Sequence, residues 1–381
     1  MDILRGFAIL GILLANIVAF ATPVVTSDLQ MAQGSGTQIE GFVAWLVAGK
    51  YRSLLAILFG MGLGMQFQSQ SARGNWPNAY YRRTLILMIF GLIHAILLWF
   101  GDILFIYSII AFISMQFVKL NTRQLTIIAT SLIILGVLMG LVLAVSSTTS
   151  ADMLTGLPES WQYTLSAEGE TFAYSEGSYG LQLLYRLGSF SMMLMSIVFI
   201  SFDLVGLFLL GIVFSRIQLL QNLNESRPLL KKFLAIGLIG LLLNLPAYFA
   251  IVQGWQFQYL YVVELGLAAP VSLGIIGAIG LTYLSFPKLL SWLQPIGKMA
   301  LSCYLMQTLI CTTYFYSYGF GMFGKLTEEQ LYFQVVPAVW IANLLFATLW
   351  LKFFNMGPME YLWRKMSKDL PSQYRNSHMF S

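Results

Sequence analysis

Long apolar runs separated by short polar stretches fill the chain from its first residues to beyond position 350. Most of these runs are close to the roughly 20 residues with which an α-helix crosses a bilayer, so the pattern predicts an all-α, polytopic transmembrane bundle of about ten spans. The expected spans are residues 4–25, 41–67, 83–99, 103–118, 125–145, 186–216, 233–252, 259–284, 299–318 and 331–354.

The polar stretches indicate how the chain is organised. Residues 1–381 are expected to form a single integral membrane domain. Residues 146–185 form the longest polar stretch, carry several carboxylates and have no Lys or Arg, which predicts an extracytoplasmic loop. Such a loop could serve as a lid or an acceptor-binding surface, or it could simply be solvated.

Composition supports the membrane class. Hydrophobic residues make up 58% of the chain and charged residues 10%, against about 45–50% and about 25% in soluble domains. The net charge of +5 comes from basic residues spread between the spans, so nucleic acid is not expected as a partner. Cys303 and Cys311 are about 12 Å apart along one helix, too far for a disulfide, and no Cys/His spacing typical of a metal site is present.

The distribution of positive charge predicts the orientation in the membrane. If the amino terminus is cytoplasmic, the alternation of spans places almost all of the 21 Lys and Arg residues in cytoplasmic segments. The exceptions are Lys50, Arg52, Arg186 and Lys325. Since Lys and Arg accumulate on the cytoplasmic side, both termini are predicted to be cytoplasmic.

Residues 91–112, GLIHAILLWFGDILFIYSIIAF, combine two apolar runs with His94 and Asp102 on either side of a turn. Ionisable groups inside a membrane are costly unless they pair or face a polar cavity. His94 is expected about 7 Å below the outer turn, and Asp102 at the turn itself. Either residue could be structural instead, with His94 bonded to a backbone carbonyl and Asp102 capping the next helix.

Further polar side chains are expected at similar depth, and the cost of leaving them in lipid predicts that they converge on one polar cavity in the outer half of the membrane. Asp203 is expected nearer the midplane. Lys50 and Arg52 could instead snorkel to the interface, or mark a helix that begins near Tyr51. The candidate substrate-binding residues are Asn16, Lys50, Asp203, Glu264 and Gln307.

Five segments carry a resemblance to a known family: DILRGFAILGILLANI, GKYRSLLAILFGMGLGMQ, GDILFIYSI, GKMALSCYLMQTLICTTYFYSYGFGMFG and GPMEYLWRK. They resemble the YeiB family of bacterial inner-membrane proteins over nearly the whole chain. The resemblance implies a bacterial inner-membrane location and a carboxyl-terminal domain of unknown function over residues 220–381. The signature begins almost at the first residue, so a few preceding residues are expected in the natural protein.

The first two segments are also distantly similar to the heparan-glucosaminide acetyltransferases and related transmembrane acyltransferases. That resemblance implies a comparable helical bundle and transfer of an acyl group from cytosolic acyl-CoA, as co-substrate, to an envelope glycan or lipid acceptor. The essential histidine of the glucosaminide branch precedes the second helix, whereas residues 23–50 contain no histidine. A base would therefore have to be His94 or a carboxylate.

The acyltransferase hypothesis assigns His94 as the base and Asp102 as the group that orients it. Arg52 or Lys50 would stabilise the developing negative charge. Acyl-CoA would approach from the basic loops near Arg82, Arg83, Lys231 and Lys232.

Two alternatives belong to other functional classes. In a transporter or small-molecule-binding protein, Asp203, Glu264 and His94 would couple to protons or cations, with broken helices at Pro246 and Pro270. No internal repeat between the two halves supports this alternative. A non-catalytic membrane scaffold is the third possibility, and the sequence leaves the oligomeric state open.

Overall fold

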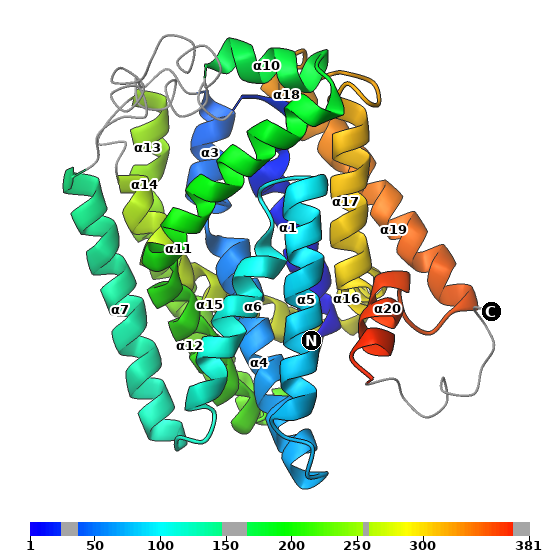
Figure 1. Ribbon diagram of the computed structural model, residues 1–381. Coiled ribbons are helices and arrows are strands. Elements are labelled where there is room, and N and C mark those ends of the chain that lie inside the picture. The colour runs from blue at the N-terminus through cyan, green and yellow to red at the C-terminus, as the bar shows by residue number, and fades with distance from the viewer. Residues whose placement is uncertain (24–36, 147–165, 254–258, 369–381) are drawn as a thin grey trace.

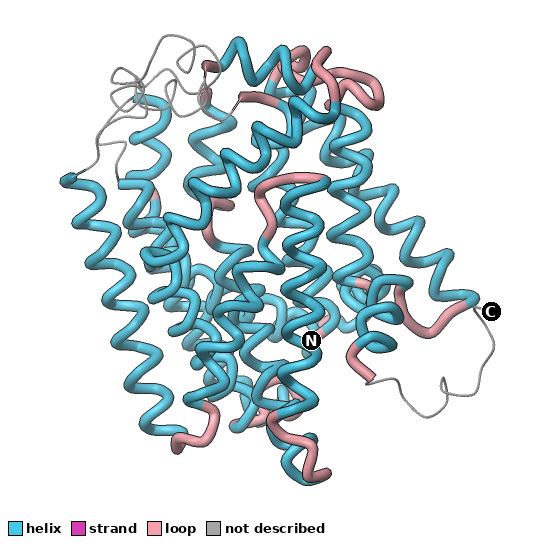
Figure 2. The backbone as a smooth tube through the Cα atoms, in the orientation of Figure 1, coloured by secondary structure: helices cyan, strands magenta, loops and turns pink. Residues whose placement is uncertain are grey.

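The computed structural model describes residues 1–23, 37–146, 166–253 and 259–368. Every regular element in these residues is a helix, and the described chain contains no strand (Figure 2). The prediction of an all-α bundle is confirmed. The described part has eight segments long and apolar enough to cross a membrane, which indicates a membrane protein. The span count of about ten and the cytoplasmic termini stay predictions.

The helices run mostly side by side, with α10 across one end of the bundle (Figure 1). The longer helices are α1 (Asp2–Ala21), α4 (Lys50–Ala72), α5 (Asn78–Leu97), α7 (Thr122–Ser146), α11 (Tyr179–Arg216), α12 (Leu223–Asn244), α15 (Ala268–Ser285), α17 (Ala300–Phe315) and α19 (Val336–Phe353). The shorter helices are α3 (Gln38–Leu46), α6 (Ile103–Ser114), α10 (Ala167–Ser175), α13 (Pro246–Gln253), α14 (Tyr259–Val262), α16 (Gln294–Lys298), α18 (Glu328–Gln330) and α20 (Pro358–Met366).

The second predicted span is broken at Gly49. This residue has φ of 75°, a left-handed conformation that suits glycine, and it separates α3 from α4. A Cβ at Gly49 would also lie 3.0 Å from the Cβ of Ala268, so the break brings this turn against α15. Lys50 and Arg52 consequently lie in the first turn of α4, close to the helix start that the sequence suggested near Tyr51.

The α5–α6 hairpin forms as predicted, but its turn is covered rather than exposed at the outer surface. Arg186 of α11 is fully buried, and its guanidinium donates to the carbonyl oxygens of Leu97 and, at 3.0 Å, Leu98. The hydroxyl of Tyr179 also donates to the Leu97 carbonyl, at 2.7 Å. These groups satisfy the free carbonyls at the end of α5 and hold α11 over the turn.

The expected loop over residues 146–185 contains more structure than the sequence indicated. Residues 147–165 lie outside the described part of the chain. After them, Ser166 caps α10, and α11 begins at Tyr179, seven residues before the expected span. Glu170, one of the carboxylates of this segment, is buried at 7% exposure. The polar composition of this segment concealed the helix α10 and the beginning of the helix α11.

The first helix is packed at unusually short range against the carboxyl-terminal part of the chain. A Cβ at Gly6 would lie 2.3 Å from the carbonyl oxygen of Leu293, and one at Gly297 only 1.7 Å from that of Asp2. Glycine therefore allows α1 and α16 to touch through their backbones. The amino-terminal segment and the region containing α16, α17 and α20 thus build one wall of the interior.

Candidate functional site

The side chains of His94 and Asp102 lie in contact in the interior, between α5 and α6. The Nδ1 atom of His94 lies 2.8 Å from Asp102 Oδ2, and the two residues are 2% and 1% exposed. Nδ1 has no hydrogen bond of good geometry among the described residues, so the contact with Asp102 is defined by the short distance between the two atoms. Gly91 permits it, since a Cβ there would lie 2.6 Å from Asp102 Oδ1.

Both carboxylate oxygens of Asp102 have separate partners. Oδ1 accepts a hydrogen bond of 2.6 Å from the backbone N–H of Phe105, which caps α6. Oδ2 faces His94 and also lies 3.5 Å from the hydroxyl of Tyr304 on α17. The cap explains why Asp102 has a fixed position, and it leaves the second oxygen directed at the imidazole.

The second nitrogen of His94 faces α17. Its Nε2 atom lies 2.9 Å from the hydroxyl oxygen of Thr308, which is 1% exposed. The side chain is therefore held between Asp102 on one side and Thr308 on the other, and it does not bond a backbone carbonyl as the structural alternative supposed. This arrangement fixes both ring nitrogens of the histidine.

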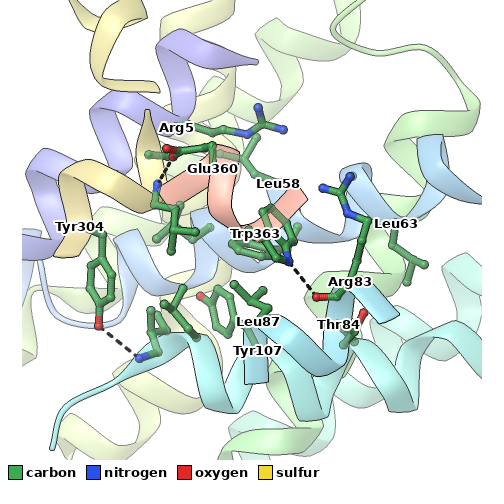
Figure 3. Close-up of a pocket in the computed structure, with 18 of the residues that line it drawn as sticks. Arg5, Leu58, Leu63, Arg83, Thr84, Leu87, Tyr107, Tyr304, Glu360 and Trp363 are labelled. Atoms are coloured by element: carbon green, nitrogen blue, oxygen red, sulfur yellow. Dashed lines mark hydrogen bonds between the residues drawn. The ribbon is translucent and has the colours of Figure 1, made fainter. Parts of the chain in front are cut away.

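A pocket of about 230 Å³ leads toward this cluster (Figure 3). Its walls come from α1, α4, α5, α6, α16, α17 and α20. Tyr304 and Ile103 line it, and the Tyr304 hydroxyl accepts a 3.4 Å hydrogen bond from the Ile103 N–H. Because Ile103 follows Asp102 directly, the pocket approaches the buried pair with Tyr304 between them. The apolar walls include Ile9, Leu55, Leu58, Phe59, Leu63, Leu87, Leu104 and Leu301.

Cationic side chains line the same pocket: Arg5, Arg83, Lys298 and Arg364. All belong to the residues predicted on the cytoplasmic side. Of the basic residues expected to guide acyl-CoA, only Arg83 lines the pocket, whereas Arg82, Lys231 and Lys232 are exposed elsewhere. The other three cations of the pocket come from α1, α16 and α20.

Glu360 is the carboxylate among these cations, and it ties α20 to α17. Its Oε1 atom accepts hydrogen bonds of 2.8 and 3.2 Å from the N–H groups of Leu301 and Ser302, and its Oε2 accepts from the Ser302 hydroxyl. Burial nevertheless raises the pKa of this carboxyl above its usual range. Trp363, one turn later, donates to the Arg83 carbonyl at 2.8 Å and packs on the Arg83 guanidinium.

Arg52 forms an ion pair with Asp203. Its Nη2 atom lies 3.7 Å from Asp203 Oδ2, and it also donates to the backbone carbonyl of Glu264. Asp203 is fully buried, and neither of its oxygens has a hydrogen-bond partner among the described residues. The Glu264 side chain is exposed, so it does not line a cavity with the other candidates.

The remaining candidates occupy separate places. Lys50 is fully buried, and its Nζ atom donates to the Ala44 carbonyl at 3.1 Å. Gln307 donates to the Ile9 carbonyl at 3.1 Å, and Asn16 is half-buried on α1.

The candidates therefore form two clusters instead of one outer cavity. One contains His94, Asp102, Tyr304 and Thr308, and the other contains Arg52 and Asp203. Tyr107 connects the second cluster with the pocket, since its ring lines the pocket and its hydroxyl donates to the Arg52 carbonyl. Figure 3 shows Tyr107 and Tyr304 on the side of the pocket away from Arg5 and Glu360. None of the residues that the sequence predicted to share a cavity lines this pocket, which touches the two clusters only through Tyr304 and Tyr107.

Tyr304 and Thr308 were absent from the sequence-based candidates. Both lie in the segment GKMALSCYLMQTLIC that carried the family resemblance, and their spacing of four places them on one helix face. That spacing could have indicated a shared site, but tyrosine and threonine are common in apolar helices and do not by themselves indicate a function. Within the described residues, no group of three or more His, Cys, Asp or Glu side chains could hold a metal ion.

The amino-acid sequence of the chain is similar to those of several bacterial proteins. The profile of a family described as "Protein of unknown function (DUF418)" matches residues 214–368. YeiB of Escherichia coli is 31% identical over 96% of this chain and 95% of its own length. YxaH of Bacillus subtilis is 28% identical over 96% and 92%, respectively. A 39.9 kDa protein encoded beside an amylase in Bacillus acidopullulyticus is 26% identical, with the same coverage. No solved structure matches the chain.

Proposed function

We propose that this chain, which belongs to the YeiB family, is an acyltransferase of the bacterial inner membrane. It takes an acyl group from cytosolic acyl-CoA and transfers it to a hydroxyl group of an envelope glycan or lipid. The family and the apolar helices support a membrane protein. The chemistry proposed here rests on the pocket and on the buried histidine beside it.

The observation that carries the proposal is the continuity between the pocket and the His94 cluster. Cationic residues line the pocket, its walls are largely apolar, and Tyr304 is shared with the Asp102–His94 pair. A ligand with an anionic head and a slender, mainly apolar arm would match the cationic side chains and the apolar walls of this pocket. Acyl-CoA has that form, with phosphates at one end and a thioester at the other.

The cationic part of the pocket suits the phosphates. Arginine and lysine bind phosphate through charge-assisted hydrogen bonds. Arg83 is held in place by Trp363, and Arg364 lies one residue further along α20. Binding at Arg5, Arg83 and Arg364 would direct the pantetheine arm between α4, α5 and α17, with the thioester toward Tyr304.

The chemistry needs a base for the attacking hydroxyl and a donor for the oxyanion. His94 Nε2 can accept the proton, while Asp102 beside Nδ1 stabilises the resulting imidazolium. The Tyr304 hydroxyl faces both the pocket and Asp102, and it replaces Arg52 and Lys50 as the donor to the oxyanion. The thiolate of CoA leaves with the proton that His94 received.

Mass spectrometry of envelope glycans and lipids provides the test. Cells that lack the protein should lose an acyl modification that the wild-type gene restores and a His94→Ala gene does not. Equal accumulation of both proteins in the membrane is the necessary control. Identical envelopes with and without the protein would refute the proposal.

The Arg52–Asp203 pair favours one other candidate function. A fully buried carboxylate whose oxygens lack hydrogen-bond partners among the described residues is typical of proton- or cation-coupled transporters. In that case Asp203→Asn would abolish uptake or export of a solute and leave envelope acylation intact. The acyltransferase proposal predicts instead that envelope acylation is lost when His94 is replaced.

A further inference from the structure

Thr308, His94 and Asp102 form a continuous chain of three side chains. Thr308 Oγ1 lies 2.9 Å from His94 Nε2, and His94 Nδ1 lies 2.8 Å from Asp102 Oδ2. A hydroxyl, an imidazole and a carboxylate in this order are the arrangement that activates nucleophilic hydroxyl groups in enzymes of unrelated folds. All three residues are almost completely buried.

Two other hydroxyl groups in the bundle, those of Thr312 and Ser108, contact their own helices instead. Thr312, one turn beyond Thr308 on α17, has its hydroxyl 3.5 Å from the carbonyl oxygen of Leu309. Ser108 donates to the Leu104 carbonyl at 2.7 Å. Such bonds to the preceding turn are the usual way in which a membrane helix satisfies a hydroxyl. Thr308 instead faces the imidazole of another helix.

We propose that Thr308 is the nucleophile that receives the acyl group from acyl-CoA, forming an acyl-Thr308 ester before the acceptor reacts. This inference rests on the proposed acyltransferase function and adds a covalent intermediate to it. The pocket supports the assignment because Tyr304, which lines it, lies four residues before Thr308 on the same helix face. To reach the Thr308 hydroxyl, the thioester would have to extend past Tyr304 by about one helical turn, roughly 6 Å of rise.

The two half-reactions balance. In the first, Thr308 Oγ1 attacks the thioester carbonyl carbon while its proton moves to His94 Nε2. The new C–O bond forms, the C–S bond breaks, and the CoA thiolate takes the proton from Nε2 and leaves as the thiol. In the second, the acceptor hydroxyl gives its proton to Nε2 and attacks the ester carbon. The Thr308 oxygen then leaves and regains a proton from the imidazolium.

A covalent intermediate has a direct consequence for the arrangement in the membrane. The donor occupies a pocket whose cations are predicted on the cytoplasmic side, whereas the acceptor belongs to the envelope. With the acyl group stored on Thr308, the two substrates need not be bound at the same time. Thr308, on α17, would hold the acyl group after the donor has left and until the acceptor binds.

The test uses the purified full-length protein in detergent, incubated with acetyl-CoA and no acceptor. Mass spectrometry of the digested protein should find one acetyl group on the peptide that contains Thr308. Thr308→Ser should retain the adduct, because it keeps the hydroxyl. Thr308→Val, which is close in shape, should lose it, and envelope acylation in cells should fall by at least about a thousandfold.

Thr312→Val is the matched control, since it removes a buried hydroxyl one turn away on the same helix. It should leave the adduct and the acylation unchanged, and thermal unfolding identifies any variant that fails to fold. Wild-type protein that acylates the envelope but forms no Thr308 adduct would overturn this inference alone, as would full acylation by Thr308→Val. Envelopes that do not depend on the protein would instead refute the proposed function, even if Thr308 became acetylated.

Discussion

The hydroxyl of Tyr304 lies 3.5 Å from Asp102 Oδ2, and the same side chain lines the pocket between α5, α6 and α17. One residue therefore separates a ligand-sized pocket from a buried imidazole–carboxylate pair. If the pocket holds the acyl donor and the His94–Asp102 pair performs acid–base chemistry, the Tyr304 hydroxyl lies next to the place of the reacting carbonyl.

Replacing Tyr304 by Phe should impair chemistry far more than stability. The variant keeps the ring and removes the hydroxyl, so the Ile103 N–H loses an acceptor and the oxyanion loses a donor. Acylation should fall about a hundredfold to a thousandfold, as for other lost oxyanion donors. Stability should fall by about 1 kcal/mol. Envelope acylation and thermal unfolding would be measured for this variant, with Tyr283→Phe as the control. Acylation by Tyr304→Phe equal to that by the wild type would exclude the assigned role.

Neutralising the cationic part of the pocket should weaken binding of acyl-CoA. Lys298→Gln combined with Arg364→Gln removes two charges that line the pocket. Lys288→Gln is the control, because it removes an exposed charge that is also predicted on the cytoplasmic side. The Kd of acetyl-CoA should rise about tenfold to a hundredfold in the double variant. The wild-type Kd should also rise with salt. Titration calorimetry measures both effects, and an unchanged, salt-independent Kd would place the phosphates elsewhere.

Binding in this pocket should depend on pH through Glu360. Because burial raises the pKa of Glu360, the folded protein holds this proton at pH values where the unfolded chain has lost it. Its contribution to stability is complete below the unfolded pKa and is lost as the pH rises through the folded pKa. Over that rise the pocket gains a negative charge, so affinity for acetyl-CoA should decrease.

Glu360→Gln should remove this pH step, while the exposed Glu225→Gln should preserve it. Calorimetric titrations between acid and neutral pH would distinguish the two variants. A step that persists unchanged in Glu360→Gln would have to be assigned to another group.

Arg186→Met should destabilise the bundle. The guanidinium donates to the carbonyl oxygens of Leu97 and Leu98 at the end of α5, in the turn that precedes Asp102. The Leu97 carbonyl keeps the Tyr179 hydroxyl as a donor, whereas the Leu98 carbonyl loses the donor that Arg186 supplies. A buried carbonyl left without a donor lowers the free energy of unfolding by about 1–3 kcal/mol. The melting temperature in detergent should fall clearly, and that of Arg123→Met, an exposed control, should not. Equal melting temperatures would mean that the α5–α6 turn is held in another way.

The sequence predicted the features that depend on local pattern. Apolar runs predicted the helices, and the Gly-Asp turn predicted the α5–α6 hairpin with Asp102 at a helix start. His94 and Asp102 lie close because they flank one turn and because Gly91 leaves room for the carboxylate.

The features that the sequence did not predict depend on contacts between distant helices. Arg52 and Asp203 are far apart along the chain, and nothing in the spacing favours Asp203 over Glu264 as the partner of Arg52. Arg186 was identified only as an exceptional outer cation, although it secures the end of α5. Thr308 became a candidate only when its hydroxyl was seen to face His94.

Transfer of an isotopic label in sealed, inside-out membrane vesicles tests the central claim most directly. Acetyl-CoA and succinyl-CoA, labelled in the acyl group, would be supplied to the exposed cytoplasmic face, and the lipid and glycan fractions would be analysed for the label. Vesicles with the wild-type protein should incorporate it, and vesicles with equal amounts of His94→Ala should not. Equal incorporation by His94→Ala, or none by the wild type, would contradict the account.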